Sequence, residues 1–434
     1  MIVFFSDIHL TDGTSGTTIN PEAFELFAER VLDLVGRRHP RDVRLVLLGD
    51  GLDVIRSGRW LETDDVKPWS PPSGQQERTT LEVVEAILDS NRGAIGTLRD
   101  IPGRITRRAG GRMSSDQASL TYVLGNHDWL INRYTSCRRL VVERLGLQEQ
   151  DSEAGFPLVY TCPEHQVIGR HGDIYDRFNF DAARGRDASS IGDAIVIELV
   201  NRFPLEVGKE IEDEERRKEV VARLREIDNV RPLSVIPRWV IKVSEDLGEA
   251  DPALKQAMRL ALDRCVEQFA EGPAYKAFVG RQLNLIQRLC LRRMLAQLPK
   301  LKLSLLDRVS RRWTKLSQAW RLACSKSASE YAAYAGKDRD ESGAEPRFVI
   351  YGHTHREETV PLGPLATGKP HRFYLNTGTW RCVWEECLSG TGPREFASWK
   401  VMSYAVIYRP NEAEGEHVFE TWDGRLADRD VALA

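Results

Sequence analysis

Short apolar runs that each stop at a cluster of polar residues are the main feature of the hydrophobic pattern. Runs of four or five residues rich in Val, Ile, Leu and Phe, bounded by Gly or turn residues, predict buried β-strands. Five such runs and the clusters that follow them are Ile2–Phe5 with Ser6-Asp7-Ile8-His9, Leu45–Leu48 with Gly49-Asp50-Gly51-Leu52-Asp53, Leu120–Leu124 with Gly125-Asn126-His127-Asp128, Val167–Ile168 with Gly169-Arg170-His171-Gly172-Asp173, and Phe348–Tyr351 with Gly352-His353-Thr354-His355.

Helical periodicity separates the early strands, since apolar residues recur there at spacings of three and four. This alternation of strands and helices predicts an α/β fold. We expect helices over about Glu22–Val35 and Thr79–Leu98, and loops over Trp60–Gln76 and Ile101–Asp116. Three later strands are predicted at Phe373–Leu375, Tyr404–Tyr408 and Val418–Thr421.

A long stretch between the fourth and fifth strands, about Asp187–Tyr334, has almost no strand signal. Its helical pattern is interrupted by prolines, which predicts several separate helices. The polar segment Gly336–Pro346 reads as a linker back into the sheet. We therefore predict a discontinuous catalytic domain, residues 1–186 and 346–434, with a helical insertion domain at residues 187–345.

Composition excludes several classes of protein. The chain has 434 residues, with 61 Lys and Arg against 64 Asp and Glu, and 41% of its residues are hydrophobic. These values exclude wholesale disorder and a polybasic protein. No apolar run reaches the roughly 18–20 residues of a membrane span, so we expect no transmembrane segment. The start, Met1–Leu10, lacks a charged leader, and we expect no signal peptide. Seven cysteines without a Cys-x-x-Cys pair favour free thiols and a cytoplasmic location.

The polar clusters supply oxygen and imidazole ligands and no thiolate, a set that suits Mn²⁺, Fe or Zn²⁺. Ligands just past the carboxyl ends of strands lie where α/β sheets place their sites. Each cluster alone is also explained as a turn, but five in this order favour a site for two metals. The candidate ligands are Asp7, His9, Asp50, Asn126, His171, His353 and His355.

The order of these clusters resembles the calcineurin-like metallophosphoesterase superfamily, over about Met1–Asp176 and Phe348–Tyr408. The resemblance implies a four-layer α/β/β/α sandwich with a dinuclear metal centre at the strand ends. From the chemistry of the ligand set we expect two divalent ions, most simply Mn²⁺, with Fe or Zn²⁺ as alternatives. The resemblance also implies that Asp7, His9 and His355 hold one metal, that Asn126, His171 and His353 hold the other, and that Asp50 bridges them.

The resemblance further implies that His127 donates a proton to the leaving group and that Asp128 can orient it. An imidazole can serve as such an acid near neutral pH. Asp53 and Asp173 are candidates for holding ligand imidazoles in one tautomer, or for stabilising turns.

We therefore expect a metal-dependent phosphoester hydrolase, specifically a phosphodiesterase of nucleotides or nucleic acids that acts by attack of a metal-bridged hydroxide. One alternative is a membrane-surface lipid or sugar-nucleotide pyrophosphatase resembling the UDP-diacylglucosamine pyrophosphohydrolases. This chain departs from that group by having His127 where the group usually has Arg and by its longer insertion. The other alternative is a non-catalytic scaffold, which the intact ligand set disfavours.

The insertion carries a strongly basic segment, Arg281–Lys326, in which Asp307 is the only acidic residue. A helical face of one charge sign predicts a polyanionic partner, a nucleic acid or nucleotide, ahead of peripheral contact with an anionic membrane. The remaining alternative is a solvated outer face of a packed helix. The candidate substrate-binding residues are Arg308, Arg311, Arg312 and Lys315.

Overall fold

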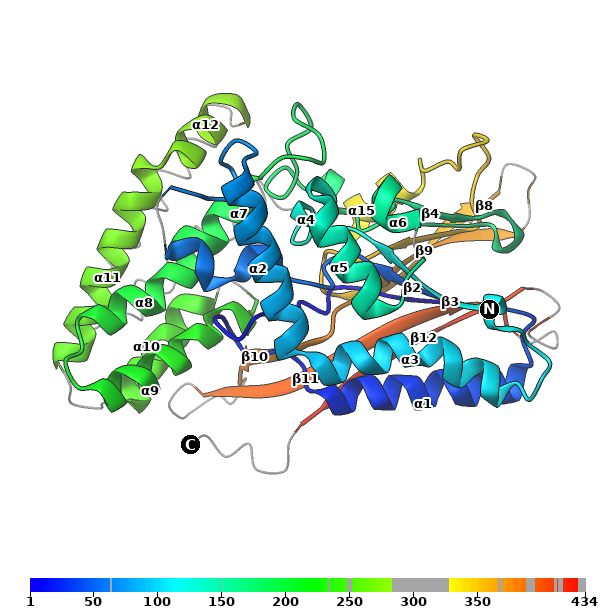
Figure 1. Cartoon of the computed structure of the whole chain (residues 1–434), viewed down its shortest axis with the longest axis horizontal. Helices are drawn as coiled ribbons and strands as arrows, with labels where there is room; N and C mark the ends of the chain where they lie inside the picture. The colour runs from blue at the N-terminus through cyan, green and yellow to red at the C-terminus, as the bar shows by residue number, and fades with distance from the viewer. Residues whose placement is uncertain are drawn as a thin grey trace.

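The computed structural model describes residues 1–62, 65–148, 150–232, 235–247, 252–282, 328–365, 368, 370–387, 395–409, 412 and 417–427 (Figure 1). They form a mixed α/β fold built on two mixed β-sheets. This confirms the predicted α/β class.

The larger sheet has the strand order β3-β2-β1-β11-β10-β6, with β12 pairing β11. Strands β1, β2 and β3 run parallel, whereas β11 is antiparallel to β1, β10 and β12. Its strands are β1 (Ile2–Phe5), β2 (Val43–Leu48), β3 (Ala118–Val123), β6 (Val230–Arg231), β10 (Arg381–Glu386), β11 (Phe396–Ile407) and β12 (Phe419–Leu426).

The smaller sheet has the order β4-β5-β7-β9-β8. Its central strands β5, β7 and β9 are parallel, and β4 and β8 are antiparallel edges. Its strands are β4 (Tyr160–Cys162), β5 (Val167–Gly169), β7 (Phe348–Tyr351), β8 (Glu357–Pro364) and β9 (His371–Thr377). All eight predicted strands are present, and short or half-exposed β4, β6, β8 and β10 are additional.

The two sheets pack face to face through one apolar cluster. Ile2 and Phe4 of β1 share this cluster with Phe348 and Ile350 of β7. Side chains alternate across a strand, so Val3 and Phe5 point to the opposite face, where helices cover them. All four residues of β1 are therefore buried, which explains its uninterrupted apolar sequence.

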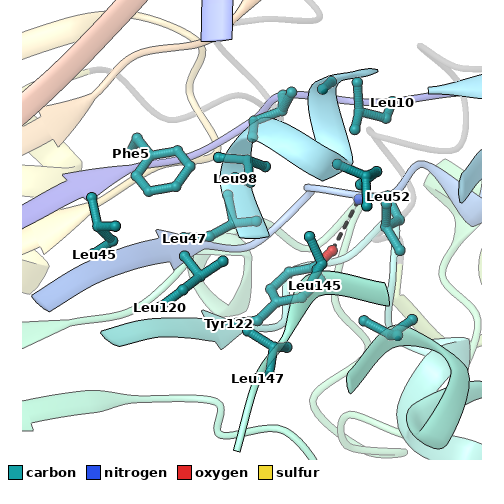
Figure 2. Packing of buried hydrophobic residues seen from close by; sticks show 14 of the residues in the cluster. Phe5, Leu10, Leu45, Leu47, Leu52, Leu98, Leu120, Tyr122, Leu145 and Leu147 are labelled. Atoms are coloured by element: carbon teal, nitrogen blue, oxygen red, sulfur yellow. Dashed lines mark hydrogen bonds between the residues drawn. The ribbon is translucent and has the colours of Figure 1, made fainter. Parts of the chain in front are cut away.

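Helices cover the outer face of the larger sheet. Figure 2 shows this layer around Phe5, Leu47 and Leu120, with Leu98 of α3 above the strands. The Leu52 amide donates a hydrogen bond of 2.9 Å to the Tyr122 hydroxyl, which joins the loop after β2 to strand β3. The helices outside the insertion are α1 (Pro21–Arg38), α2 (Gly74–Ser90), α3 (Arg92–Arg108), α4 (Leu130–Arg133), α5 (Thr135–Leu145) and α6 (Gln150–Ala154).

The predicted helix Thr79–Leu98 is two helices, because the backbone leaves the helical region at Asn91. The Asn91 side chain donates to the Thr11 carbonyl at 2.8 Å, which ties this break to the loop after β1. The prediction of a loop over Ile101–Asp116 is partly wrong. Helix α3 continues through Pro102 to Arg108, and its residues Ile101 and Ile105 are buried.

The described part of residues 187–345 is mainly helical, as expected, and several of its helices gather at one end of the sheets, on the left of Figure 1. They share an apolar cluster that includes Trp239 and reaches Phe396 of β11. The segment also contributes β6, which pairs with β10 at the sheet edge. Its helices are α7 (Ile191–Ile195), α8 (Arg202–Lys209), α9 (Glu214–Arg225), α10 (Ile236–Asp246), α11 (Pro252–Glu271), α12 (Pro273–Gln282) and α15 (Ala328–Ala335).

Helix α15 lies on the outer face of the smaller sheet, where Tyr331 and Ala335 pack against Val349 and Tyr374. Within the described residues, no helix is both long enough and apolar enough to cross a membrane.

Candidate metal centre

The structure brings all seven predicted metal ligands to one place, at the carboxyl ends of five strands. Three triads of carboxylate and imidazole groups have ligand atoms within 4.8 Å of one another. They are Asp7 with His9 and His355, Asp7 with Asp50 and His171, and Asp50 with His9 and His127. Asn126 and His353 complete the cluster, because the Asn126 Oδ1 lies 3.1 Å from ring nitrogens of both His171 and His353.

The hydrogen bonds of His171 leave a lone pair that only a proton or a cation can satisfy. Its Nδ1 lies 2.8 Å from the Leu48 carbonyl oxygen, so Nδ1 carries the proton of the neutral ring. The other nitrogen, Nε2, then faces Asn126 Oδ1 at 3.1 Å and Asp50 Oδ2 at 3.2 Å, which are both acceptors. A proton on Nε2, or a cation bound among these three atoms, would remove the mismatch.

His9 repeats the arrangement. Its Nδ1 donates to Asp53 Oδ2 at 2.7 Å. Its Nε2 therefore points with a lone pair toward His355 Nε2, at 3.0 Å, and toward the carboxylates of Asp7 and Asp50. The buried Oδ1 of Asp7 has no well-aligned hydrogen-bond donor among the described residues, although His355 Nε2 lies 3.2 Å away. A carboxylate held in this state is a ready metal ligand.

In His353 the nitrogen held by an outer acceptor is Nε2, whereas in His9 and His171 it is Nδ1. Its Nε2 lies 3.2 Å from Asp176 Oδ2, which accepts the ring proton, and its Nδ1 faces the amide oxygen of Asn126. Three imidazoles thus have their outward nitrogens fixed by acceptors, as metal-bound histidines usually do. The residues present fit a metal ion on this ground.

His355 differs from these three. Its Nε2 lies 3.2 Å from Asp7 Oδ1, but its Nδ1 faces a donor, the Nη2 of Arg231, at 3.4 Å. The surroundings of this ring therefore do not fix the tautomer that binds a metal through Nε2.

Backbone strain is concentrated at the same residues. Seven described non-glycine residues have a positive φ, and five of them are candidate ligands. Such conformations are costly for residues with a Cβ and persist where the surroundings enforce them, most often at functional sites. The five are Asp7 (52°), His9 (50°), Asp50 (52°), His353 (69°) and His355 (57°).

Two glycines allow the loops to approach one another. A Cβ atom at Gly125 would collide with the Asp50 carboxylate, and one at Gly352 would collide with Ser6 and Asp7. The glycines in the Gly-Asn-His-Asp and Gly-His-Thr-His clusters are therefore required by close packing around the carboxylates.

Electrostatic coupling in the cluster is strong. Burial opposes ionisation of Asp7 and Asp50, but the imidazoles, above all His171, hold the pKa of both carboxyl groups below the usual range. Burial would lower the pKa of His171, but the charges of Asp50 and Asp7 raise it to about 10. The cluster therefore holds its carboxylates ionised and attracts positive charge.

His127 lies beside the cluster and is oriented by Asp53, whose Oδ1 is 2.7 Å from Nδ1. One carboxylate thus holds both His9 and His127. The side chain of His127 is 17% exposed, which makes it one of the more open residues of a site whose carboxylates are buried. Burial would lower its pKa, but Asp53 and Asp50 raise the pKa of His127 to about 9.

The prediction that Asp128 orients His127 is wrong, because the carboxylate that contacts this ring is Asp53. Asp128 instead accepts hydrogen bonds from the amides of Gly125 and Gly51 and from the Tyr122 hydroxyl. It fixes the loops that carry Asn126 and Asp50. The Asp128 carboxylate accepts a hydrogen bond from the amide three residues before it, a contact that stabilises the turn between Gly125 and Asp128.

Of the two candidates for holding ligand imidazoles, Asp53 does so and Asp173 does not. The Asp173 carboxylate is ion-paired with Arg186. Asp176, three residues further on, contacts His353 instead. The sequence contains no signal that separates these two aspartates, because both follow the same Gly172 turn.

Three arginines beside the site, of which Arg56 and Arg381 are buried and Arg231 is half-buried, were not predicted from the sequence. Arg56 follows Asp53 in the loop after β2, Arg381 begins β10, and Arg231 lies on β6. Arg56 donates to Asp53 Oδ2 at 3.3 Å. In the sequence these arginines are far apart and flanked by unremarkable residues, so only the fold reveals their proximity.

The predicted substrate-binding residues of the basic segment, Arg308, Arg311, Arg312 and Lys315, lie outside the described residues. Comparison with protein-family models, with curated proteins and with solved structures gives no match.

Proposed function

We propose that this protein is a metal-dependent hydrolase of phosphate esters, of the calcineurin-like metallophosphoesterase type. The observation that carries the proposal is the ligand cluster itself, in which His9, His171 and His353 each have one ring nitrogen held by an outer acceptor and the other turned toward the inner oxygen ligands. These inner contacts require positive charge, either as protons on the imidazoles or as bound cations. The scaffold alternative gives no reason for gathering two buried carboxylates and several imidazoles around one point.

In this proposal Asp7, His9 and His355 hold one divalent ion, Asn126, His171 and His353 hold the second, and Asp50 lies between both groups. Oxygen and nitrogen ligands of this kind suit Mn²⁺, with Fe or Zn²⁺ as alternatives. Two such ions, when bound, would polarise a phosphoryl group and lower the pKa of a water molecule, so that hydroxide is available to attack it.

His127 donates the proton to the leaving oxygen in this scheme. Asp53 accepts the Nδ1 proton of His127, so the Nε2 proton of the imidazolium is the one available for transfer. The same carboxylate also holds His9, so the acid and one metal ligand are positioned by a single group. Asp128 holds the loops that carry Asn126 and Asp50 by accepting hydrogen bonds from Gly125, Gly51 and Tyr122.

The packing supports the sandwich that the proposal implies. Helices cover the outer face of the larger sheet, the sheets share an apolar interface, and α15 covers the outer face of the smaller sheet. We propose that these four layers are the α/β/β/α sandwich of the superfamily, and that the helical segment is an insertion in it.

The substrate class proposed is a phosphodiester of a nucleotide or nucleic acid. The support is the one-sign basic face of the segment Arg281–Lys326 in the sequence.

Hydrolysis assays with added Mn²⁺ test the proposal directly. We expect turnover of bis-p-nitrophenyl phosphate, loss of turnover after chelation, and recovery when Mn²⁺ is returned. Metal analysis should give about two ions per chain, as a dinuclear centre requires. A protein that binds no divalent metal and hydrolyses no ester in a panel of mono-, di- and pyrophosphate esters would refute the proposal.

Charge reversal of Arg308, Arg311, Arg312 and Lys315 to Glu tests the polymer partner. We expect weaker nucleic-acid binding and a shallower salt dependence of affinity, because fewer counterions are released. Turnover of bis-p-nitrophenyl phosphate serves as the control and should persist. Equal activity of wild type and variant on nucleic acid at every salt concentration would remove the polymer from the proposal.

A further inference from the structure

Three arginines gather on one side of the metal centre, around Asp228. Arg56 and Arg381 both form ion pairs with its carboxylate. Arg231, on β6 of the helical segment, donates from Nη1 to the Asp228 carbonyl oxygen at 2.7 Å. Arg56 also contacts Asp53, the carboxylate that holds His9 and His127.

The cluster contains more positive than negative charge. Arg56 and Arg381 share Asp228, and Asp53 is already used by two imidazoles. Among the residues that the structure describes, no carboxylate lies within 4.0 Å of the Arg231 guanidinium. The buried Nε of Arg56 has no hydrogen-bond partner there either. Removing cations from water without counter-charge is costly, and an anion at this point would relieve the cost.

Arg231 also links this cluster to the metal ligands. Its Nη2 lies 3.4 Å from Nδ1 of His355, and that ring is 19% exposed. When His355 binds a metal through Nε2, its Nδ1 carries the ring proton and no longer accepts a hydrogen bond. The Nη2 group of this half-buried arginine is then free to donate to another acceptor beside the site.

We propose that Arg231, backed by Arg56 and Arg381, binds a second phosphate of the substrate, adjoining the phosphate that reacts at the metal centre. This inference rests on the proposed function for the identity of the reacting group. A guanidinium suits this task because its planar fork matches two phosphate oxygens. The substrate then carries two neighbouring phosphates, either as a phosphoanhydride or as a nucleotide diester with a terminal phosphate.

Binding of non-hydrolysable ligands tests the proposed second-phosphate subsite without turnover. Titration calorimetry on the Mn²⁺-loaded protein would compare methylenediphosphonate, which has two phosphonates, with methylphosphonate, which has one. Arg231→Gln should weaken the diphosphonate by about 10- to 100-fold, the usual effect of losing a charged hydrogen-bonding partner, and the monophosphonate much less. Equal weakening of both ligands, or none, would overturn the inference.

Arg264→Gln is the matched control. This arginine belongs to the same helical segment, but its charge is already paired with Glu206 at 3.1 Å and Glu210 at 2.8 Å. Any withdrawal of metal by the diphosphonate affects wild type and control alike, and metal analysis after titration measures it. Arg231→Lys keeps the charge without the fork and should retain an intermediate affinity, which also covers the case in which Arg231→Gln does not fold.

Kinetics identify the source of the second phosphate. A dinucleoside diphosphate, a 5′-phosphorylated dinucleotide and thymidine 5′-p-nitrophenyl phosphate would be compared in wild type and Arg231→Gln. We expect KM to rise at least about tenfold, with a smaller change in kcat, for whichever two-phosphate substrate uses the subsite. If the affinity for the diphosphonate depends on Arg231 but the protein hydrolyses no ester, the proposed function alone is refuted. If the protein hydrolyses esters but neither binds nor turns over two-phosphate compounds in preference to one-phosphate compounds, the second-phosphate subsite alone is refuted.

Discussion

The two sheets contribute different chemistry to the metal centre. The loops after β1, β2 and β3 of the larger sheet supply every oxygen ligand, with His9 as their one imidazole ligand. The loops after β5 and β7 of the smaller sheet supply imidazoles only. The oxygen ligands are Asp7, Asp50 and Asn126, and the imidazoles of the smaller sheet are His171, His353 and His355.

This division means that neither sheet contains a complete site. Each metal of the proposed pair needs carboxylate or amide oxygen from one sheet and imidazole nitrogen from the other. The sheets otherwise meet through apolar side chains such as Phe4 and Phe348. These fix the spacing of the sheets, but apolar packing is non-directional and does not orient the ligand side chains. The ligands therefore depend on close packing of the loops, which explains the glycines at positions 125 and 352.

The largest expected effect comes from the group that serves both metals. Asp50→Asn should abolish turnover and lower metal content, because a neutral amide cannot bridge two cations as a carboxylate does. Metal analysis and assays with bis-p-nitrophenyl phosphate measure the two effects. Asp89→Asn, at a half-exposed carboxylate of α2 that is ion-paired with Arg92 and Arg144, is the control and should change neither. Unchanged metal content and turnover in Asp50→Asn would disprove the dinuclear assignment.

His127→Ala should separate the proton donor from the ligands. We expect both metals to stay bound and the rate to fall by roughly 10²- to 10⁴-fold, most for esters with a poor leaving group. A p-nitrophenyl ester, whose leaving group needs little protonation, should lose less. A series of aryl and alkyl esters measures this gradation. An equal loss for all leaving groups, with metals retained, would instead assign His127 to stabilising charge on the phosphoryl oxygens.

A smaller effect distinguishes the carboxylates that orient the imidazoles in the two sheets. Asp53 holds His9 of the larger sheet and also His127, whereas Asp176 holds only His353 of the smaller sheet. Such partners are typically worth 10- to 100-fold in metal affinity or activity. Asp53→Asn should therefore reduce both metal affinity and the rate of the fully loaded enzyme. Asp176→Asn should reduce metal affinity alone.

Competition with a fluorescent chelator measures metal affinity, and turnover at saturating Mn²⁺ measures the rate of the fully metal-loaded enzyme. A rate loss in Asp176→Asn that saturating metal does not restore would contradict the division of roles between these carboxylates.

The candidate ligands were predictable from the sequence because each follows a buried strand directly. Runs such as Ile2–Phe5 and Phe348–Tyr351 are apolar on both faces, so their ends, and hence Asp7 and His353, are unambiguous. The break at Asn91 and the half-exposed strand β8 were not predictable. The first depends on a contact with Thr11 far away in sequence, and the second lacks a continuous apolar face.

The groups that orient the ligands were only partly predictable, since their roles depend on which loop faces which. Asp128 is adjacent to His127 in sequence, yet its carboxylate turns back to the Gly125 amide. Asp53 reaches His127 from a different strand. Arg231 lies in a segment predicted as helical, and it approaches His355 only because β6 pairs with β10.

The smallest expected effect is at Asp173, and it sharpens the contrast with Asp176. Both aspartates follow His171 closely, but Asp173 is ion-paired with Arg186 and touches no ligand imidazole, whereas Asp176 accepts the proton of His353. Asp173→Asn should therefore lower the free energy of unfolding by about 1–3 kcal/mol, through the lost charged contact, while metal affinity stays within about threefold of wild type. Thermal unfolding and the chelator competition measure these quantities. If Asp173→Asn weakened metal binding as much as Asp176→Asn, the imidazoles of the smaller sheet would respond to overall negative charge near the loop. The specific hydrogen bond to His353 would then not be what fixes its tautomer.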